Sequence, residues 1–334
     1  MEFGILNQSP ILEGQAVALS IKDTIELAKK ADESGYRRYY VSEHHNEPLA
    51  GTAPEIMISH LLAHTKHINI GSGGVMLQHY NPFKVAEQFQ LMSHLAPGRV
   101  DLGIGKAPGG LHLSTTALRS GLKEEQPSFA DKFKALTHFV NQTHTGEFQG
   151  LKTSPDTSNP PEIFLLGSSP DSAAFSAREN VNFIYAHFIS NDGQKLKDSI
   201  GAYRKANKAG KFIVALSVIV TDDKEIEAQL KEENVVYELH HESGKILRVN
   251  GKERAESTVA ASDEPVKAKR VEADIIIGTQ EEVLKKLEWY IQNSGIDELM
   301  FHLPTKNKSL RHQTIEALAP VQTIHKNPEI NMAK

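Results

Sequence analysis

Residues 39–46, YYVSEHHN, end a short β-type run with one carboxylate and two adjacent imidazoles. Imidazole, whose ordinary pKa is about 6.5, is the side chain best suited to pass protons near neutral pH. Neighbouring residues at a strand end point to opposite sides, so we expect one of His44 and His45 to face a site and the other to pack beneath it. Glu43 is a candidate to orient the ring. A hydrogen-bonded core histidine and a two-imidazole metal site are the alternatives.

A metal site needs more ligands than this pair supplies. The later strand ends offer chiefly His187 and His302, so we favour a proton-handling histidine over a metal. His60 and His64 lie four residues apart in a helical pattern but lack the H-E-x-x-H arrangement, and we expect them at the surface.

A second polar group follows residues 163–167, where IFLLG leads into Ser168, Ser169 and Pro170. Serine followed by proline is typical of a helix N-cap. The free N–H groups and positive dipole end of that helix would make an anion pocket, to which Lys106 could add a charge. Taken alone, the motif favours a simple helix cap over a binding site.

A third group is the glycine-rich stretch 67–80, HINIGSGGVMLQHY. Glycines at a strand end allow either unusual backbone angles or a flat ligand against bare backbone, and a tight turn is an equally good interpretation. Neither this stretch nor DLGIGKAPGG contains G-x-G-x-x-G, and no P-loop pattern occurs. The chain therefore shows no dinucleotide-binding fingerprint.

These groups need a scaffold that brings strand ends together. Short β-branched runs alternate with amphipathic helical stretches, which predicts a parallel sheet with helical crossovers. The predicted strands are 3–7, 37–42, 67–73, 100–104, 163–167, 182–187, 212–219 and 298–303. Eight such units favour an α/β fold, a (β/α)8 TIM barrel, whose site lies at the C-terminal ends of the strands. A doubly wound sheet is the alternative.

The intervening helices have recognisable starts. Ser20 with Asp23 resembles a capping box, Asn81-Pro82 opens a second helix, and Thr279 with Glu282 caps a third. Residues 105–160 and 222–273, after the fourth and seventh strands, resemble insertions. We expect only one clear helix in the first, and in the second a helix followed by a polar segment without pattern, typical of a lid. We predict one domain over residues 1–334.

The amino-acid composition excludes several functional classes for this protein. The 334 residues are 39% hydrophobic and 24% charged, with a net charge of −5 and no cysteine. Thiolate chemistry and disulfides are thereby excluded, and the scattered cations give no basic stripe for nucleic acid. No window resembles a signal peptide or membrane span, so we expect a cytoplasmic protein with a small-molecule substrate and no membrane partner.

Six motifs resemble, in order and spacing, those of the bacterial luciferase-like flavin-dependent monooxygenases. They are YRRYYVSEHHN, AGTAPEIMISHLLAHT, INIGSGGVMLQHYNPFKVAEQF, LAPGRVDLGIGKAPGG, LLGSSPDSAAFSA and IIIGTQEEVLKKL. The resemblance covers most of the chain and is weakest at 111–160 and 222–273. It implies a barrel mouth that binds reduced FMN and uses O2 as co-substrate to oxygenate a small organic molecule.

The resemblance also assigns the phosphate end of the flavin. Ser169 and Ser172 match positions that hold the phosphate, with Ser168 beside them, and Lys106 aligns with a basic residue of the same loop. Many relatives carry an aspartate soon after APG, whereas this chain reads APGGLHLS, so contacts from that loop differ.

At the ring end, Gly73-Gly74 matches a non-proline cis peptide that lies against the flavin. His44 matches a histidine near the reacting flavin, which would make it a proton donor or acceptor there. Luciferase has a cysteine where this chain has Gly105, so light emission is not implied.

The resemblance extends to partners. It implies a separate flavin reductase, a homodimer formed through barrel helices, and a mobile lid at 222–273. The alternatives are a deazaflavin-dependent oxidoreductase of the same fold, a non-catalytic flavin-binding protein, and a metal-dependent hydrolase.

Overall fold

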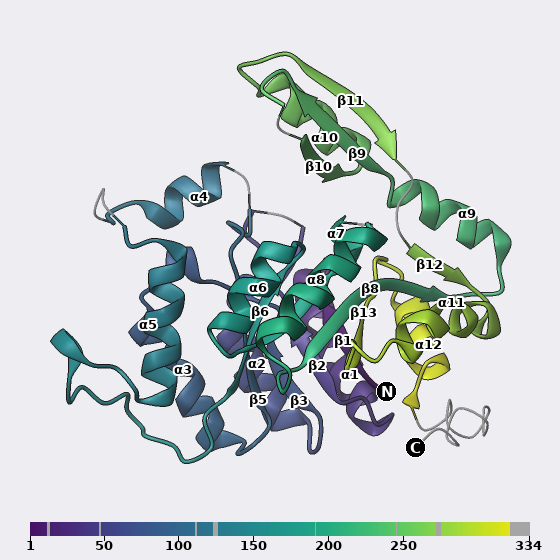
Figure 1. The fold of residues 1–334 in the computed structure, drawn as a ribbon. Coiled ribbons are helices and arrows are strands. Elements are labelled where there is room, and N and C mark those ends of the chain that lie inside the picture. The colour runs from purple at the N-terminus through teal and green to yellow at the C-terminus, as the bar shows by residue number, and fades with distance from the viewer. Residues whose placement is uncertain are drawn as a thin grey trace.

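Parallel strands close into a barrel in the computed structural model of the chain (Figure 1). In order around the barrel they are β1 (Glu2–Asn7), β2 (Arg38–Val41), β3 (Asn69–Ser72), β5 (Val100–Gly105), β6 (Glu162–Gly167), β7 (Asn182–Ala186), β8 (Phe212–Val220) and β13 (Glu298–His302). Parallel pairing of β13 with β1 and of β7 with β8 completes the ring. The predicted (β/α)8 barrel is confirmed, and every predicted strand is present with ends shifted by at most about two residues.

The structure describes residues 1–11, 14–46, 48–110, 112–122, 126–190, 192–244, 246–271 and 275–320. Two short strands extend the barrel wall at its C-terminal end. β4 (Val75–Met76) pairs with β5 beyond the end of β3, and β12 (Ile275–Gly278) pairs with the last residues of β8.

None of the helices in the described residues combines the length and apolarity needed to cross a bilayer.

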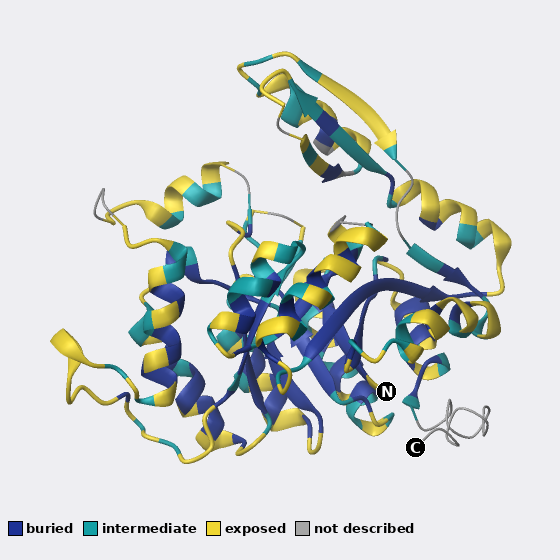
Figure 2. Ribbon diagram, viewed as in Figure 1, coloured by how far each residue is buried: buried dark blue, intermediate teal, exposed yellow. Residues whose placement is uncertain are grey.

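A layer of helices surrounds the barrel, each with its apolar face turned inward (Figure 2). They are α1 (Val17–Glu33), α2 (Pro54–His64), α3 (Pro82–Leu95), α5 (Phe129–Asn141), α6 (Pro170–Arg178), α8 (Gly193–Ala206), α11 (Gln280–Gln292) and α12 (Lys308–Ala317). The predicted starts at Asn81 and Thr279 are confirmed as N-caps, the latter with a full capping box.

The predicted start of α1 at Ser20 is wrong. The helix begins three residues earlier, at Val17, and Ser20 and Asp23 are both buried within it. Asp23 instead accepts hydrogen bonds from Arg311 Nη1 (2.8 Å) and His312 Nε2 (2.9 Å) of α12. Polar residues that resemble a cap therefore serve a tertiary contact, which single-sequence patterns do not distinguish.

The barrel interior is filled in layers. At the N-terminal end Arg38 is fully buried, donates to Glu298 Oε2 (2.8 Å), and is paired with Asp101. Above this charged layer lies an apolar one made of Leu6, Tyr40, Phe164, Ile184, Ile213, Ala215 and Met300. The interior below the mouth is thus a packed core, so ligands must enter from the C-terminal end.

The two predicted insertions both contain more structure than the sequence indicated. The first holds α4 (His112–Arg119) and a short turn of 3-10 helix (Gly146–Phe148) in addition to α5. The second holds α9 (Lys224–Glu233), β9 (Val236–His241), β10 (Ile246–Asn250), α10 (Lys252–Ala260) and β11 (Val266–Val271), with residues 245, 272 and 273 outside the described part.

The expectation that 222–273 lacks a pattern is therefore wrong. Strands β10, β9 and β11 form an antiparallel sheet whose own small core contains Leu239, Val249 and Ala255. Because only a few apolar residues are needed for such a small core, polar residues dominate the composition. Figure 1 shows this sheet at the same end of the barrel as α4 and α7 (His187–Ser190), which both follow strand C-termini. Whether it acts as a lid stays a prediction.

Candidate active site

One wall of the barrel mouth consists of bare backbone. Asn69 of β3 donates a hydrogen bond to Asp101 of β5 inside the barrel. Residues two apart on a strand face the same side, so Gly71 and Gly73, which follow Asn69 at two-residue steps, also face inward. Gly103, two residues after Asp101, faces inward for the same reason. An added Cβ would overlap Leu6 at Gly73 and the Ser72 carbonyl at Gly103, and at Gly74 it would lie 2.8 Å from the Gly103 carbonyl. This wall therefore accepts no side chains.

The peptide bond between Gly73 and Gly74 is cis. The resemblance to flavin enzymes predicted a cis bond at this position, and this part of the prediction is confirmed. Its contact with a flavin ring stays a prediction.

Glu43 lies behind the mouth and is fully buried. Its carboxylate accepts hydrogen bonds from the Met76 backbone N–H (2.9 Å), Tyr80 Oη (2.7 Å) and His45 Nε2 (2.7 Å). Burial and the Glu43 carboxylate together raise the pKa of Tyr80, which keeps the phenol protonated. Within the described part of the chain, these three donors hold the buried carboxylate and no lysine or arginine is paired with it.

Of the two histidines, His45 is the one whose ring is hydrogen-bonded to Glu43; a role of Glu43 in orienting a catalytic ring stays a prediction. Residues two apart in an extended segment share a side, so Glu43 reaches His45, while His44 lies between them and points to the other side. The expectation that only one of the two histidines faces the mouth is consistent with this arrangement. His44 itself is half-buried, with its backbone N–H bonded to the Gly51 carbonyl at 2.7 Å.

His302, at the end of β13, lies inside the mouth near His44. Its Nδ1 is 2.9 Å from Ser217 Oγ and its Nε2 is 3.0 Å from Gln8 Oε1, while the Phe188 ring stacks on the imidazole. Burial, reinforced by the positive charges of His44 and Arg311, lowers the pKa of His302 to about 3. The ring is therefore neutral, and because Gln8 Oε1 can only accept, the proton sits on Nε2.

The loop after β6 has the predicted cap. Ser169 Oγ accepts the Ser172 backbone N–H (3.2 Å) and donates to Ser172 Oγ (3.0 Å), and Pro170 is the first residue of α6. A Cβ at Gly167 would lie 2.7 Å from Ser172 Cβ, so glycine lets the strand end approach the helix. Ser168, Ser169 and Ser172 thus surround the N-terminus of α6, where an anion is favoured.

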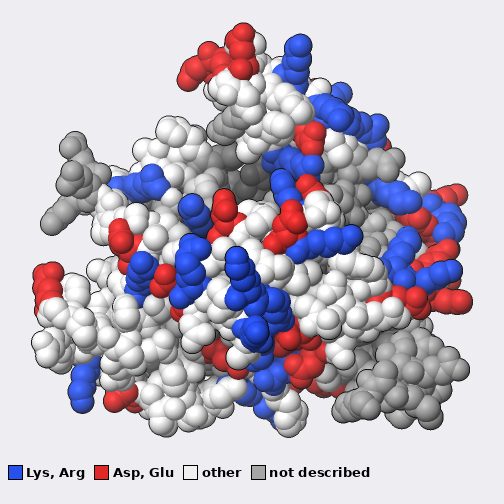
Figure 3. Space-filling model, viewed as in Figure 1, with Lys and Arg blue, Asp and Glu red and all other residues white. Residues whose placement is uncertain are grey.

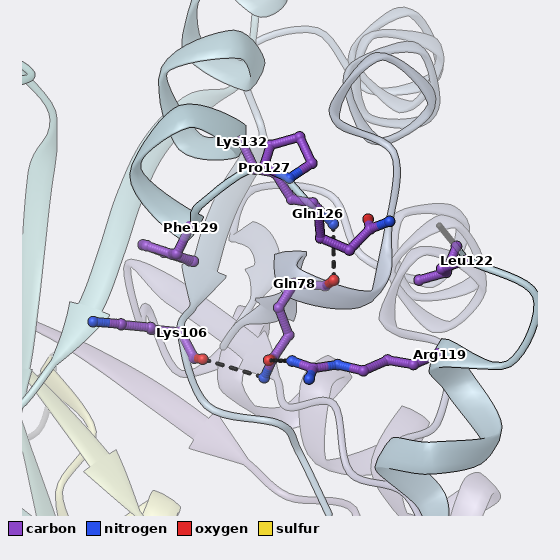
Figure 4. A pocket seen from close by; sticks show the side chains of 8 residues that line it. All are labelled: Gln78, Lys106, Arg119, Leu122, Gln126, Pro127, Phe129 and Lys132. Atoms are coloured by element: carbon purple, nitrogen blue, oxygen red, sulfur yellow. Dashed lines mark hydrogen bonds between the residues drawn. The ribbon is translucent and has the colours of Figure 1, made fainter. Parts of the chain in front are cut away.

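Lys106 leaves β5 and lines a cavity of about 510 Å³ (Figure 4). The cavity lies between α4, the N-terminal end of α5 and the 3-10 turn η1 (Leu77–His79). Its lining residues are Gln78, Lys106, Arg119, Leu122, Gln126, Pro127, Phe129 and Lys132. Three of the eight are cations and none is acidic, so the cavity has a positive potential.

Comparisons with known proteins match nearly the full length of the chain. A family model described as luciferase-like monooxygenase matches residues 1–298. The chain belongs to the luciferase-like monooxygenase family. Among curated relatives, the N-acetyl-S-alkylcysteine monooxygenase of Bacillus subtilis (strain 168) is 38% identical over 327 residues, covering 94% of this chain and 97% of that protein.

Solved structures agree with the assignment. The crystal structure of apo-MsnO8 is 29% identical, has a TM-score of 0.73, and the match covers 95% of this chain and 98% of that one. The oxygenating constituent of 3,6-diketocamphane monooxygenase from Pseudomonas putida, in complex with FMN, shares the fold at 17% identity and a TM-score of 0.67, with 96% and 97% covered. This luciferase-like monooxygenase is accordingly an oxidoreductase with a TIM-barrel fold.

The monooxygenase has further residues at its mouth whose contacts the sequence analysis did not single out. Ser217 and Phe188 fix His302, Tyr80 and Met76 hold Glu43, and Arg119 lines the cavity. One signal was present: Lys132 interrupts the apolar stripe of α5. His187, named above as a possible metal ligand, is buried; in the described ranges no three His, Cys, Asp or Glu side chains are grouped to hold a metal.

Surface charge is mixed. Figure 3 shows Lys and Arg side chains interleaved with Asp and Glu over the visible face, as the near balance of 37 cations and 42 anions in the sequence leads one to expect. His60 and His64 are exposed on α2, as predicted.

Proposed function

We propose that this chain uses reduced FMN and O2 to transfer one oxygen atom to a small thioether-containing acid. The observation that carries the proposal is the barrel mouth, which has a side-chain-free glycine wall at one point and a serine-capped helix N-terminus at another. A flat ring and a phosphate on one molecule need such a pair of features.

The residues present fit FMN. Gly73, Gly74 and Gly103 keep this wall free of side chains, because the Cβ of any other residue there would meet Leu6, the Gly103 carbonyl or the Ser72 carbonyl. A ring at this wall would therefore lie against backbone. Ser169 and Ser172, with Ser168 and Lys106, would hold the phosphate by hydroxyl and charge. When bound, reduced FMN supplies the two electrons that let O2 give one oxygen atom to the substrate and one to water.

Protons at this mouth are handled by His44 in our proposal. His45 is bound to Glu43, and His302 is held neutral between Ser217 and Gln8. His44 is half-buried at the mouth and near neutral His302, and in our proposal its imidazole donates or accepts a proton beside the substrate. Glu43 acts as a positioning residue, because its carboxylate holds His45, Tyr80 and the Met76 backbone N–H.

The proposed substrate class is supported by the B. subtilis relative, whose name describes N-acetyl-S-alkylcysteines and whose sequence matches nearly the whole chain. We propose an S-substituted N-acylated cysteine or a similar thioether acid. No dinucleotide fingerprint occurs in the sequence, so we propose that a separate reductase delivers reduced FMN. A homodimer is also proposed from the family resemblance.

The test is anaerobic titration with reduced FMN, reduced riboflavin and a reduced deazaflavin, followed by fluorescence. We expect FMN to bind more tightly than riboflavin, and the double variant Lys106→Ala, Ser169→Ala to lose that preference. An unchanged preference in the double variant would move the phosphate site elsewhere. Binding of the deazaflavin alone would favour hydride transfer over oxygenation, and binding of neither would refute the flavin proposal.

A further inference from the structure

A polar layer lies directly above the apolar layer of the barrel interior. Gln8, Ser217 and His302 each lie two residues beyond a side chain of that apolar layer, on the continuation of β1, in β8 and in β13. Residues two apart on a strand face the same side, so all three side chains face inward. Ser217 and His302 are buried, whereas Gln8 is partly exposed. Gln8 is therefore the member of this layer that a molecule in the mouth can reach.

This polar layer lies across the mouth from the glycine wall. In the order of strands around the barrel, β13 is four places from β5 and β8 is four places from β3. Four places in a ring of eight strands means opposite sides. Gly103 lies on β5 and Gly73 directly follows β3. A molecule held against the glycine wall therefore leaves the side of Gln8 and His302 open to a second molecule.

His302 fixes the orientation of the Gln8 amide. The proton on His302 Nε2 is donated to Gln8 Oε1 over 3.0 Å, and Ser217 Oγ donates to Nδ1 of the same ring over 2.9 Å. The Phe188 ring stacks on the imidazole and restricts its rotation. Because the oxygen end of the amide is held by His302, the nitrogen end with its two N–H donors points away from it. Within the described residues, no acceptor is bonded to Gln8 Nε2.

The backbone on both sides of Gln8 is held as well. Asn7 Oδ1 accepts hydrogen bonds from Arg311 Nη2 (2.6 Å) and from the Ser9 backbone N–H (3.0 Å). The Ser9 carbonyl in turn accepts the Ala50 backbone N–H at 2.8 Å. Asn7 and Ser9 are both buried. The amide donor is thus preorganised, so little conformational entropy is lost when a ligand binds to it.

The side chains of this layer are uncharged, which defines the group that they suit. Burial lowers the pKa of His302 to about 3, so its ring is neutral. Gln8 and Ser217 carry no charge at any ordinary pH. A carboxylate placed among neutral buried groups would lack a counter-charge, whereas the carbonyl oxygen of an amide needs only an N–H donor. The free N–H groups of Gln8 therefore suit a neutral carbonyl.

We propose that Gln8 donates a hydrogen bond to the acyl carbonyl oxygen of the substrate, with His302 as the positioning residue that aims the amide. The inference rests on the N-acylated thioether substrate proposed above. It assigns to Gln8 the choice between an N-acylated cysteine derivative and the free amino acid. The ammonium group of the free amino acid offers no acceptor to the Gln8 amide and would lose its hydration at a neutral surface.

The experiment measures binding to the protein loaded with oxidised FMN, by calorimetry. The probes are N-acetyl-S-methylcysteine and its thioacetyl analogue, in which sulfur, a weak acceptor, replaces only the acyl oxygen. We expect the acetyl compound to bind about three- to tenfold more tightly than the analogue, as one neutral hydrogen bond implies. Gln8→Leu removes the donor and should bring this ratio close to one.

Further variants separate the two ends of the amide. Gln8→Glu keeps an acceptor for the His302 N–H but has no N–H donor, so it should also lose the preference. His302→Leu should lower the ratio because the amide can then turn, and His302→Gln, which retains an N–H donor, should restore part of it. The matched control is Gln149→Leu, at an exposed position that follows the turn Gly146–Phe148, and it should keep the parental ratio. FMN affinity is measured in parallel and should be unchanged in both Gln8 variants.

Three results would overturn the proposal: no binding of the acetyl compound, equal binding of the two probes by the parent protein, or a parental ratio in both Gln8 variants. A parental ratio in His302→Leu would refute the positioning role of His302. If the acetyl compound binds with the expected ratios but is not oxygenated, the proposed reaction fails while the Gln8 contact stands. If it is oxygenated and the Gln8 variants keep the parental ratio, the reaction stands and the contact is refuted.

Discussion

At the scale of single residues, the mouth contains imidazoles with different partners and therefore different capabilities. His45 is bound to a buried carboxylate, and His302 is bound on both nitrogens by neutral groups. Burial lowers the pKa of His302 to about 3, so this ring does not take up a proton near neutral pH. The proposed mechanism assigns proton transfer to His44.

Replacing His44 by alanine should slow oxygen transfer by about 100-fold or more, because general acid/base catalysis typically contributes that factor. FMN affinity should change little. The measurement is product formation per turnover with reduced FMN supplied in excess. His60→Ala, on the exposed side of α2, is the control and should retain full activity. Equal rates in His44→Ala and the parent protein would remove His44 from the reaction.

His302 should remain neutral between about pH 5 and pH 8, because its folded-state pKa of about 3 lies far below the unfolded value of about 6.5. Nitrogen-15 NMR of the imidazole should show the proton on Nε2 throughout. Replacing Gln8 by leucine removes the acceptor and should release this tautomer preference. A titration midpoint near pH 6.5 would show that the mouth is wetter than the structure indicates.

At the scale of secondary structure, close contact between strands depends on glycine. A Cβ at Gly103 would overlap the Ser72 carbonyl of the neighbouring strand. Gly103→Ala should therefore destabilise the protein by about 1–3 kcal/mol, the usual cost of overpacking. Gly201→Ala in α8, where nothing lies within 4 Å, is the control and should stabilise by about 0.5–1 kcal/mol. Urea unfolding measures both, and equal stabilities would contradict the contact.

The buried pair between α1 and α12 should make stability depend on acid pH. Burial raises the pKa of Asp23, but the hydrogen bond from His312 and the charges of Arg311 and Lys308 outweigh it, so the net shift is downward. A carboxyl whose folded pKa is lowered stabilises the fold above its unfolded pKa of about 3.9, and this contribution is lost as pH falls through the folded value.

Asp23→Asn should therefore cost about 3 kcal/mol near pH 7, because it leaves Arg311 buried without its anion. The difference from the parent protein should shrink below about pH 4. Chemical unfolding over this pH range measures it. A difference that is independent of pH would show that the pair is not ionised. The effect bears on the site, since Arg311 also donates to Asn7 Oδ1 (2.6 Å), next to Gln8.

The strands of the barrel were predictable because buried parallel strands have uninterrupted β-branched runs, as FIVALSVIV in β8 shows. The serine cap was predictable from a local motif, whereas the cis Gly73-Gly74 bond was predicted only by the resemblance to the family. The pairing of Glu43 with His45 was missed because it depends on which side each residue faces. Arg119 and Lys132 were missed because they come from separate helices and meet only through Gln78 in the folded chain.

At the scale of the whole molecule, the barrel carries an independent sheet at its mouth end and exposes apolar side chains elsewhere. Ile56 of α2 and Leu91 and Leu95 of α3 are at least half exposed, and these two helices are neighbours. Exposed apolar groups on adjacent helices are suited to an interface. The proposed homodimer would bury them.

The double variant Ile56→Glu, Leu95→Glu should therefore be monomeric in analytical ultracentrifugation at concentrations where the parent protein is dimeric. The free energy needed to bury a carboxylate in the centre of an apolar interface exceeds the stabilisation that the contact provides. Ile246→Glu, at another exposed apolar position, on β10 of the separate sheet, is the control and should remain dimeric. A parent protein that sediments as a monomer would refute the dimer.

The most direct test of the proposed reaction is the fate of molecular oxygen. The protein, reduced FMN and N-acetyl-S-methylcysteine would be mixed under oxygen gas labelled with oxygen-18, and the organic product analysed by mass spectrometry. The proposed function predicts one labelled oxygen atom in the product, and much less product with His44→Ala. Product without label, or substrate consumed by hydride transfer in the absence of oxygen, would contradict it.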